Sequence, residues 1–103
     1  MLDEYEQIIF NVISNAGGAR SDALNAMTLA RKGQLAEAEK KLADARKSIS
    51  KAHQIQTDLL QKEVNGVHTP VTLIMVHAQD HLMNAMTVID LVTEFIAYIK
   101  EGK

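Results

Sequence analysis

The sequence predicts an all-α protein, an antiparallel up-down-up bundle of three long helices. Glycine occurs at five positions and proline only once, at Pro70, so few residues interrupt the chain. Between these breaks, apolar residues recur at alternating steps of three and four, which is the spacing of one face of an α-helix. The connectors between the periodic stretches are short, so neighbouring helices are expected to run in opposite directions.

The first predicted helix ends near Gly33. Gly17 and Gly18 lie in its middle, and each costs about 1 kcal/mol relative to alanine inside a helix. We expect a kink or a close approach of another backbone there rather than a ligand-binding loop. Basic residues followed by glycine at Arg31-Lys32-Gly33 are typical of a helix end. The apolar stripe of this helix consists of Tyr5, Ile9, Val12, Ala16, Ala19, Ala23, Ala26 and Ala30.

The second predicted helix runs from about Gln34 to Val64 and is amphipathic. Its charged residues lie mostly away from the apolar face, so we interpret them as a solvated outer surface rather than a binding patch. Gly66 is expected to end this helix, and Pro70 to stand at or just before the next one. The inward stripe consists of Leu35, Ala38, Leu42, Ala45, Ile49, Ala52, Gln56 and Leu59.

The third predicted helix, from about Val71 to Tyr98, is apolar on nearly all sides. A helix of this kind belongs in an interior, and one small three-helix chain has too little interior to enclose it. We therefore expect copies of the same helix to cover its far side in a cyclic oligomer. The face expected to pack on the first two helices consists of Ile74, Ala78, Leu82, Ala85, Ile89, Val92, Ile96 and Ile99. A second face carries Leu73, His77, Asp80, Asn84, Thr87 and Leu91 at the same spacing.

The composition excludes several classes of function. With 103 residues, the chain is predicted to form one domain, residues 1–103, and its 47% hydrophobic content suffices for a core. A net charge of −2 with 4% aromatic residues provides no basic surface for nucleic acid. The absence of cysteine excludes disulfides, thiolate metal sites and cysteine nucleophiles. An acidic N-terminus argues against export, and polar residues inside the apolar run argue against membrane insertion, so we expect a soluble cytoplasmic protein.

Two histidines and an aspartate stand out in the third helix. In a cyclic oligomer, one Asp80 per chain would form a ring of carboxylates that shares protons or binds a hard cation such as Mg²⁺. The alternative is an aspartate held by hydrogen bonds within one chain. His77 and His81 are one turn apart, as two zinc ligands could be, but a third ligand is missing. A neutral His77 could instead accept a phosphoryl group, with its tautomer fixed by Gln79, His81 or a backbone carbonyl. Either histidine could also be a satisfied core residue.

The octapeptide Val76-His77-Ala78-Gln79-Asp80-His81-Leu82-Met83 closely resembles the signature of the lactose/cellobiose class of IIA proteins in the bacterial phosphoenolpyruvate-dependent sugar phosphotransferase system. Similarity continues through Asn15-Ala16-Gly17-Gly18-Ala19-Arg20-Ser21, through residues 32–38, and through residues 39–57 with Ala52-His53-Gln54-Ile55-Gln56-Thr57 at the end. The resemblance thus covers nearly the whole chain.

This resemblance implies a homotrimer that carries phosphoryl groups during uptake of a β-linked disaccharide such as cellobiose, chitobiose or lactose. The family's phosphorylated histidine falls on His77, and its metal-binding aspartate at the trimer axis falls on Asp80, which implies one Mg²⁺ per trimer. Gln79 and His81 also match the motif, and we expect them to support the phosphoryl group. In the family, phosphate arrives from the general carrier HPr and leaves to a cysteine of the cognate IIB, which serves the membrane component IIC.

Two further points concern specificity and rival functions. The octapeptide looks more like the cellobiose or chitobiose branch than the lactose branch, which favours glycine after the histidine. The stretch from Lys32 to Glu39 also resembles the start of a tetratricopeptide repeat, which would suggest a helical protein-binding module. No second copy appears at that period, and a single repeat cannot bury its apolar face.

Overall fold

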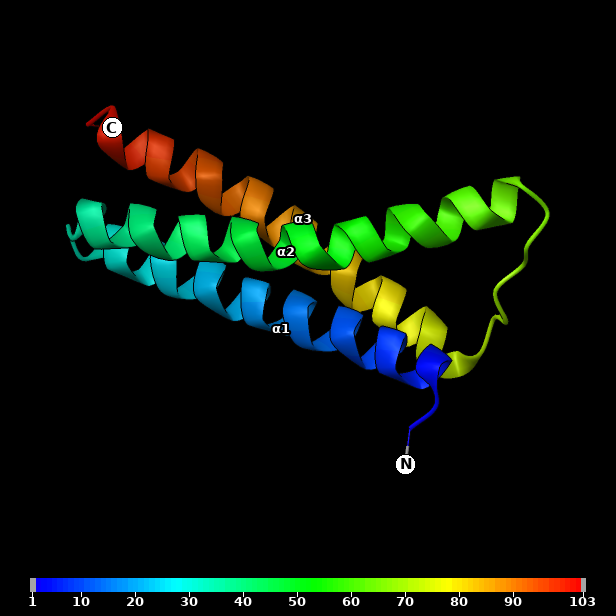
Figure 1. The fold of residues 1–103 in the computed structure, drawn as a ribbon. Coiled ribbons are helices and arrows are strands. Elements are labelled where there is room, and N and C mark those ends of the chain that lie inside the picture. The colour runs from blue at the N-terminus through cyan, green and yellow to red at the C-terminus, as the bar shows by residue number, and fades with distance from the viewer. Residues whose placement is uncertain (1, 103) are drawn as a thin grey trace.

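The computed structural model describes residues 2–102, which form three long α-helices. Helix α1 spans Glu4–Arg31, α2 spans Leu35–Val64, and α3 spans Leu73–Lys100. The helices run up, down and up in an elongated molecule of 50 × 30 × 19 Å (Figure 1). The predicted fold of the single chain is therefore confirmed.

Local capping chemistry accounts for four of the six helix boundaries. The Asp3 carboxylate accepts a hydrogen bond from the Glu6 backbone N–H at 2.8 Å, which satisfies one of the free donors at the start of α1. The first two helices are each followed by a glycine in the left-handed region, Gly33 at φ 83° and Gly66 at φ 89°. Helix α3 begins two residues later than predicted, because Thr72 rather than Pro70 is its N-cap.

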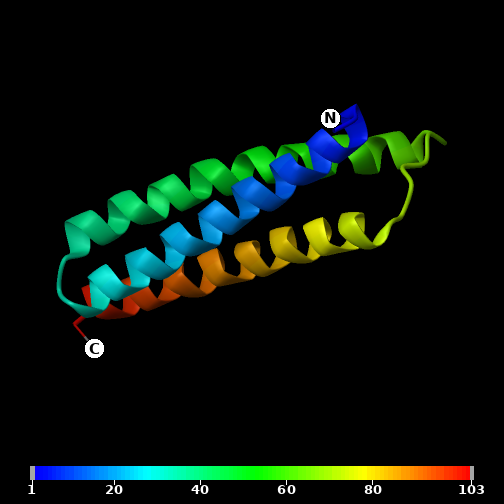
Figure 2. The ribbon, with the colours of Figure 1, turned by 90° about the horizontal axis from the view of Figure 1, so that it is seen from below.

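Helix α1 lies between the other two helices and packs against both, whereas α2 and α3 diverge toward the 65–72 connector (Figures 1 and 2). All predicted stripe positions of α1 are buried except the half-buried Tyr5. Five of these positions are alanines, which allow neighbouring helices to approach closely. The packing of α1 is therefore as predicted.

The Gly17-Gly18 pair neither ends nor interrupts α1. A methyl group built at either position would meet nothing within 4 Å outside its own helix. The expected close approach of another backbone is therefore wrong for the single chain.

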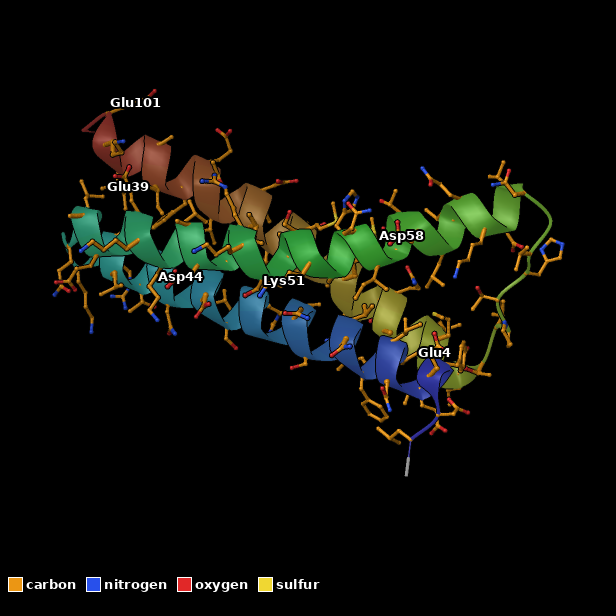
Figure 3. The ribbon with its side chains drawn as sticks, in the orientation of Figure 1. Glu4, Glu39, Asp44, Lys51, Asp58 and Glu101 are labelled. Atoms are coloured by element: carbon orange, nitrogen blue, oxygen red, sulfur yellow. The ribbon has the colours of Figure 1, made fainter. Side chains whose placement is uncertain are left out.

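The charged residues of α2 lie on its outer surface, as expected. Asp44, Lys51 and Asp58, which are labelled along α2 in Figure 3, are exposed. Within residues 2–102 no polar or charged residue is fully buried. At the end near the C-terminus, α2 and α3 are linked by an ion pair from Lys100 Nζ to Glu39 Oε1 at 2.7 Å and by a hydrogen bond from Arg46 to Thr93 at 2.9 Å.

Candidate functional site

The site residues lie in the first turns of α3, whose start is fixed by three polar groups. Thr72 Oγ1 accepts a hydrogen bond from the Met75 backbone N–H at 3.3 Å and so caps the helix. Tyr5, near the start of α1, donates its hydroxyl proton to the Pro70 carbonyl oxygen at 2.6 Å and lies 3.2 Å from Thr72 Oγ1. The first helix thereby anchors the segment that precedes His77.

His77 and His81 form a pair on the surface of α3. The His77 side chain is exposed and that of His81 is half-buried. Their Nε2 atoms are 3.0 Å apart, and the rings meet edge to face with centroids 4.5 Å apart and an interplanar angle of 87°. In a neutral pair at this distance, one Nε2–H donates and the other Nε2 accepts, so the tautomers of the two rings are linked.

Asp80 and Asn84 form a second pair one turn apart on α3. The Asn84 amide donates to Asp80 Oδ1 at 3.1 Å, and both side chains are exposed. The second predicted face of this helix is exposed throughout the single chain, with Leu73 86% and Leu91 64% exposed at its ends. Polar site residues and large apolar side chains therefore share one uncovered face.

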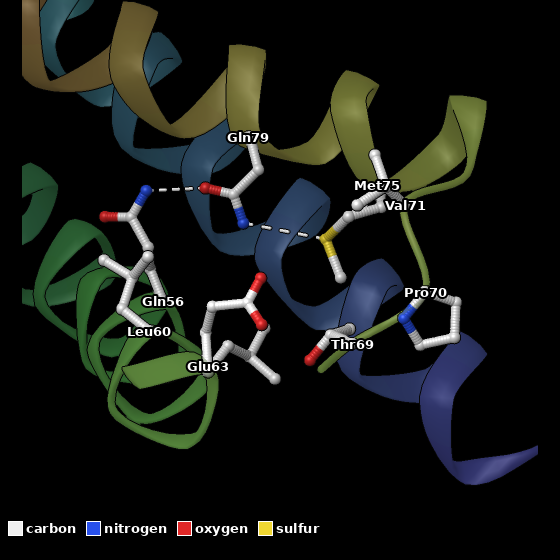
Figure 4. A pocket seen from close by; sticks show the side chains of 9 residues that line it. Gln56, Leu60, Glu63, Thr69, Pro70, Val71, Met75 and Gln79 are labelled. Carbon is white, nitrogen blue, oxygen red and sulfur yellow. Dashed lines mark hydrogen bonds between the residues drawn. The ribbon is translucent and has the colours of Figure 1, made fainter. Parts of the chain in front are cut away.

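Gln79 points to a different side of α3, because residues two apart on a helix do not face each other. Its amide oxygen accepts a hydrogen bond from Gln56 of α2, and its Nε2 lies 3.6 Å from the sulfur of Met75 (Figure 4). The structure thus brings His77 and His81 together, whereas Gln79 joins α3 to α2. Gln56 was not predicted as its partner, although a glutamine in the apolar stripe of α2 is the signal that could have indicated one.

A small cleft of about 130 Å³ lies beside Gln79, where α2 and α3 diverge (Figure 4). Met75, Gln79 and Gln56 form one wall, and the end of α2 and residues 69–71 form the rest. This lining is mostly apolar, and the cleft is open to solvent.

Within residues 2–102 of one chain, no three His, Asp or Glu side chains come together in a group that could hold a metal ion. Asp80 contributes one carboxylate, and His77 and His81 contribute two imidazoles on the neighbouring surface. The described residues of one chain therefore form no magnesium site around Asp80, and a site built from several copies of the chain stays a prediction.

Helix α3 is long and apolar enough, by length and composition alone, to cross a membrane. Only 28% of its most apolar window is buried inside the bundle. The same helix carries His77, Asp80 and Asn84 on its exposed face, and such groups are costly to place against lipid. The exposed polar stripe on this apolar helix favours contacts with protein over insertion into a membrane.

Comparison with known proteins identifies the family. Residues 7–100 match the family model of the lactose/cellobiose-specific IIA subunit of the phosphotransferase system. The chain is 54% identical over 96 residues to the lichenan-specific phosphotransferase enzyme IIA component of Bacillus subtilis, covering 93% of this chain and 87% of that protein. The chain therefore belongs to the lactose/cellobiose IIA family of the sugar phosphotransferase system.

Solved structures agree with this assignment. The cellobiose-specific enzyme IIA from Bacillus anthracis superposes with a TM-score of 0.91 at 44% identity, covering 98% of this chain and 93% of that one. The chitobiose IIA protein, solved in complex with HPr, superposes with a TM-score of 0.82 at 33% identity, covering 97% of both chains. The resemblance inferred from the octapeptide is thus confirmed, and the protein is a component of a sugar-transporting phosphotransferase system.

Proposed function

We propose that the chain is a phosphoryl carrier in which His77 accepts phosphate from HPr and passes it to a cysteine of the cognate IIB. The observation that carries this proposal is the exposed His77 ring, whose Nε2 lies 3.0 Å from Nε2 of His81. A phosphoryl acceptor must be reachable by two partner proteins in succession, and a side chain exposed on a helix meets that need. The complex of the chitobiose relative with HPr supports the choice of donor.

The phosphoryl group moves in two steps, and in each step one bond to phosphorus forms as another breaks. A lone pair on a ring nitrogen of His77 attacks the phosphorus of the donor phosphohistidine, and the donor P–N bond breaks with its electron pair returning to the donor ring. In the second step a cysteine thiolate of IIB attacks the same phosphorus, and the P–N bond to His77 breaks. Because both steps need in-line geometry more than acid or base help, alignment of the two proteins is the main requirement.

His81 is suited to hold the His77 ring in place. A hydrogen bond between the two Nε2 atoms limits rotation of the exposed ring, and after transfer the same His81 N–H could donate to a phosphoryl oxygen. Gln79 is bonded to Gln56 within one chain, so a supporting role for Gln79 would be indirect, through the packing of α2 against α3. We assign His81 the closer support.

The surface around His77 is suited to protein docking. Val76 and Met83, which flank the histidine pair in sequence, are 52% and 51% exposed. Exposed apolar side chains around a polar centre are typical of protein interfaces. Phosphorylation adds close to two negative charges to this surface. A partner protein therefore meets a different surface charge on the phosphorylated and the unphosphorylated forms.

We further propose a homotrimer with Asp80 at its axis. The uncovered face of α3 supports this assembly, because contacts between copies would remove Leu73 and Leu91 from water. Asp80 fits a hard cation by its donor chemistry: Asn84 bonds only Oδ1, and carboxylate oxygens suit Mg²⁺. Three symmetry-related Asp80 side chains would hold the ion, which would offset the repulsion between their charges.

The transported sugar and the location follow the family. Relatives specific for lichenan and cellobiose support a β-linked glucan-derived or related disaccharide as the transported substrate. A IIA component that exchanges phosphate with HPr and IIB, and so serves the membrane component IIC, belongs in the cytoplasm. The rival roles, a helical binding module and a histidine metalloenzyme, predict no phosphate uptake.

Incubation with phosphoenolpyruvate, enzyme I, HPr and a family IIB tests the proposal. The expected result is acid-labile, alkali-stable phosphate on the chain, which a stoichiometric amount of IIB removes. His77→Ala should abolish uptake, whereas His53→Ala, a change at an exposed histidine on α2, should leave it intact. Uptake that survives in His77→Ala would contradict the proposal.

A further inference from the structure

The histidine pair has the geometry of a two-point chelate for a transition metal. Imidazole nitrogens bind such metals at about 2.0–2.1 Å. For an ion bound equally to two nitrogens 3.0 Å apart, the N–metal–N angle would be about 95°. Square-planar and octahedral ions prefer angles near 90°, as Ni²⁺ and Cu²⁺ do. A tetrahedral ion such as Zn²⁺ would need the nitrogens roughly 3.3 Å apart.

The surroundings of the pair favour a cation. From Val71 to Ile99 the chain has no lysine or arginine, and its only formal charges are Asp80, Asp90 and Glu94. His77 is exposed, so water can complete the coordination shell of an ion there. Within residues 2–102, each Nε2 atom has the other Nε2 as its only hydrogen-bond partner. The two other histidines offer no such pair, since His53 has Ile49 and Thr57 one turn away and His68 contacts Glu63.

We infer that His77 and His81 together bind a divalent transition-metal ion of the Ni²⁺ or Cu²⁺ type, and that this ion and the phosphoryl group exclude each other. Chelation uses the Nε2 lone pairs of both rings, which places both ring protons on Nδ1. It breaks the hydrogen bond between the rings and puts the metal where a donor protein must approach. The competition rests on the proposed phosphoryl transfer at His77, whereas the chelate does not.

Calorimetric titration of the untagged protein with Ni²⁺ tests the chelate. We expect one ion per chain, and His77→Ala or His81→Gln should weaken binding roughly tenfold or more, because either change leaves a single ligand. Glutamine keeps a hydrogen-bonding side chain at position 81, and far-UV circular dichroism verifies that the helices remain. His53→Ala and His68→Ala should bind as the unmutated protein does. Equal binding by His77→Ala, or a loss confined to His68→Ala, would overturn the assignment.

Phosphoryl transfer from purified phospho-HPr, freed of enzyme I, tests the competition. Ni²⁺ at a concentration that occupies most of the unmutated chain but little of His81→Gln, chosen from the calorimetric titration, should slow uptake by the unmutated chain. The same concentration should not slow His81→Gln further, whatever the basal rate of that variant. Uptake unaffected by bound Ni²⁺ would overturn the competition and leave the carrier role standing. A chain that binds Ni²⁺ but takes no phosphate even without it would instead overturn the proposed carrier function and leave the chelate intact.

Discussion

Tyr5 donates a hydrogen bond of 2.6 Å to the carbonyl oxygen of Pro70, which joins the first turn of α1 to the connector in front of α3. The same hydroxyl lies 3.2 Å from Oγ1 of Thr72, the N-cap of α3. Tyr5→Phe removes this link without changing the ring, and a hydrogen bond of this kind contributes about 0.5–1.5 kcal/mol. We expect a loss of that size in the free energy of unfolding, measured with urea at fixed protein concentration.

A matched control for that change is Tyr98→Phe. Tyr98 is an exposed tyrosine near the end of α3, with no side-chain hydrogen bond among residues 2–102. Its variant should unfold like the unmutated protein. If both variants lose equal stability, the Tyr5 link does not hold the connector.

Gly17 and Gly18 offer a test of the single-chain packing. Alanine at either position would meet no atom of another element, and it gains about 1 kcal/mol of helix propensity. We expect Gly17→Ala and Gly18→Ala each to raise the free energy of unfolding by roughly that amount. A destabilised variant would show that another copy of the chain packs closely against these glycines, and sedimentation would then reveal weaker assembly.

Leucines on opposite faces of α3 should differ sharply in their effect on stability. Leu82 is 0% exposed in the core, so Leu82→Ala should cost about 2–5 kcal/mol. Leu73 is 86% exposed in the single chain, so Leu73→Ala should leave the stability of a monomer unchanged while weakening any assembly through this face. Urea unfolding at two protein concentrations separates these effects, and an equal loss in both variants would contradict the placement of the core.

Substitution of Asp80 tests its proposed position at the trimer axis. Asp80→Leu removes the carboxylate that would hold the ion and the charge that would repel its copies, so the trimer should persist or tighten while Mg²⁺ binding is lost. Asp90→Leu changes another exposed aspartate of α3 and should keep the ion. Sedimentation equilibrium and metal analysis provide the readouts. A monomeric unmutated protein at micromolar concentration would refute the axial placement.

Periodicity alone predicted most of the fold, because a stripe spaced by three and four residues must be buried when a helix packs along its whole length. Every position of the α1 stripe is buried except the half-buried Tyr5. On α3 the prediction failed at the start, where Ile74 is 38% exposed and Met75 is buried instead. The cause is that α2 and α3 diverge there, which a pattern within one helix cannot reveal.

The site was only partly predictable. Spacing placed His77 and His81 one turn apart on one side of α3, and the structure confirms their contact. It could not show that Gln79 bonds to Gln56, since that contact depends on how α2 lies against α3. The pairing of Asp80 with Asn84 follows from a spacing of four residues and could have been predicted as well.

Mapping of the phosphate by mass spectrometry tests the central claim most directly. After charging by phospho-HPr, cleavage at lysine would release His53 on the peptide 52–62 and His68, His77 and His81 together on 63–100, and fragmentation would separate the last three. We predict phosphate on His77 alone, lost when IIB is added. Phosphate on His81, His68 or His53, or none on the chain, would contradict the account.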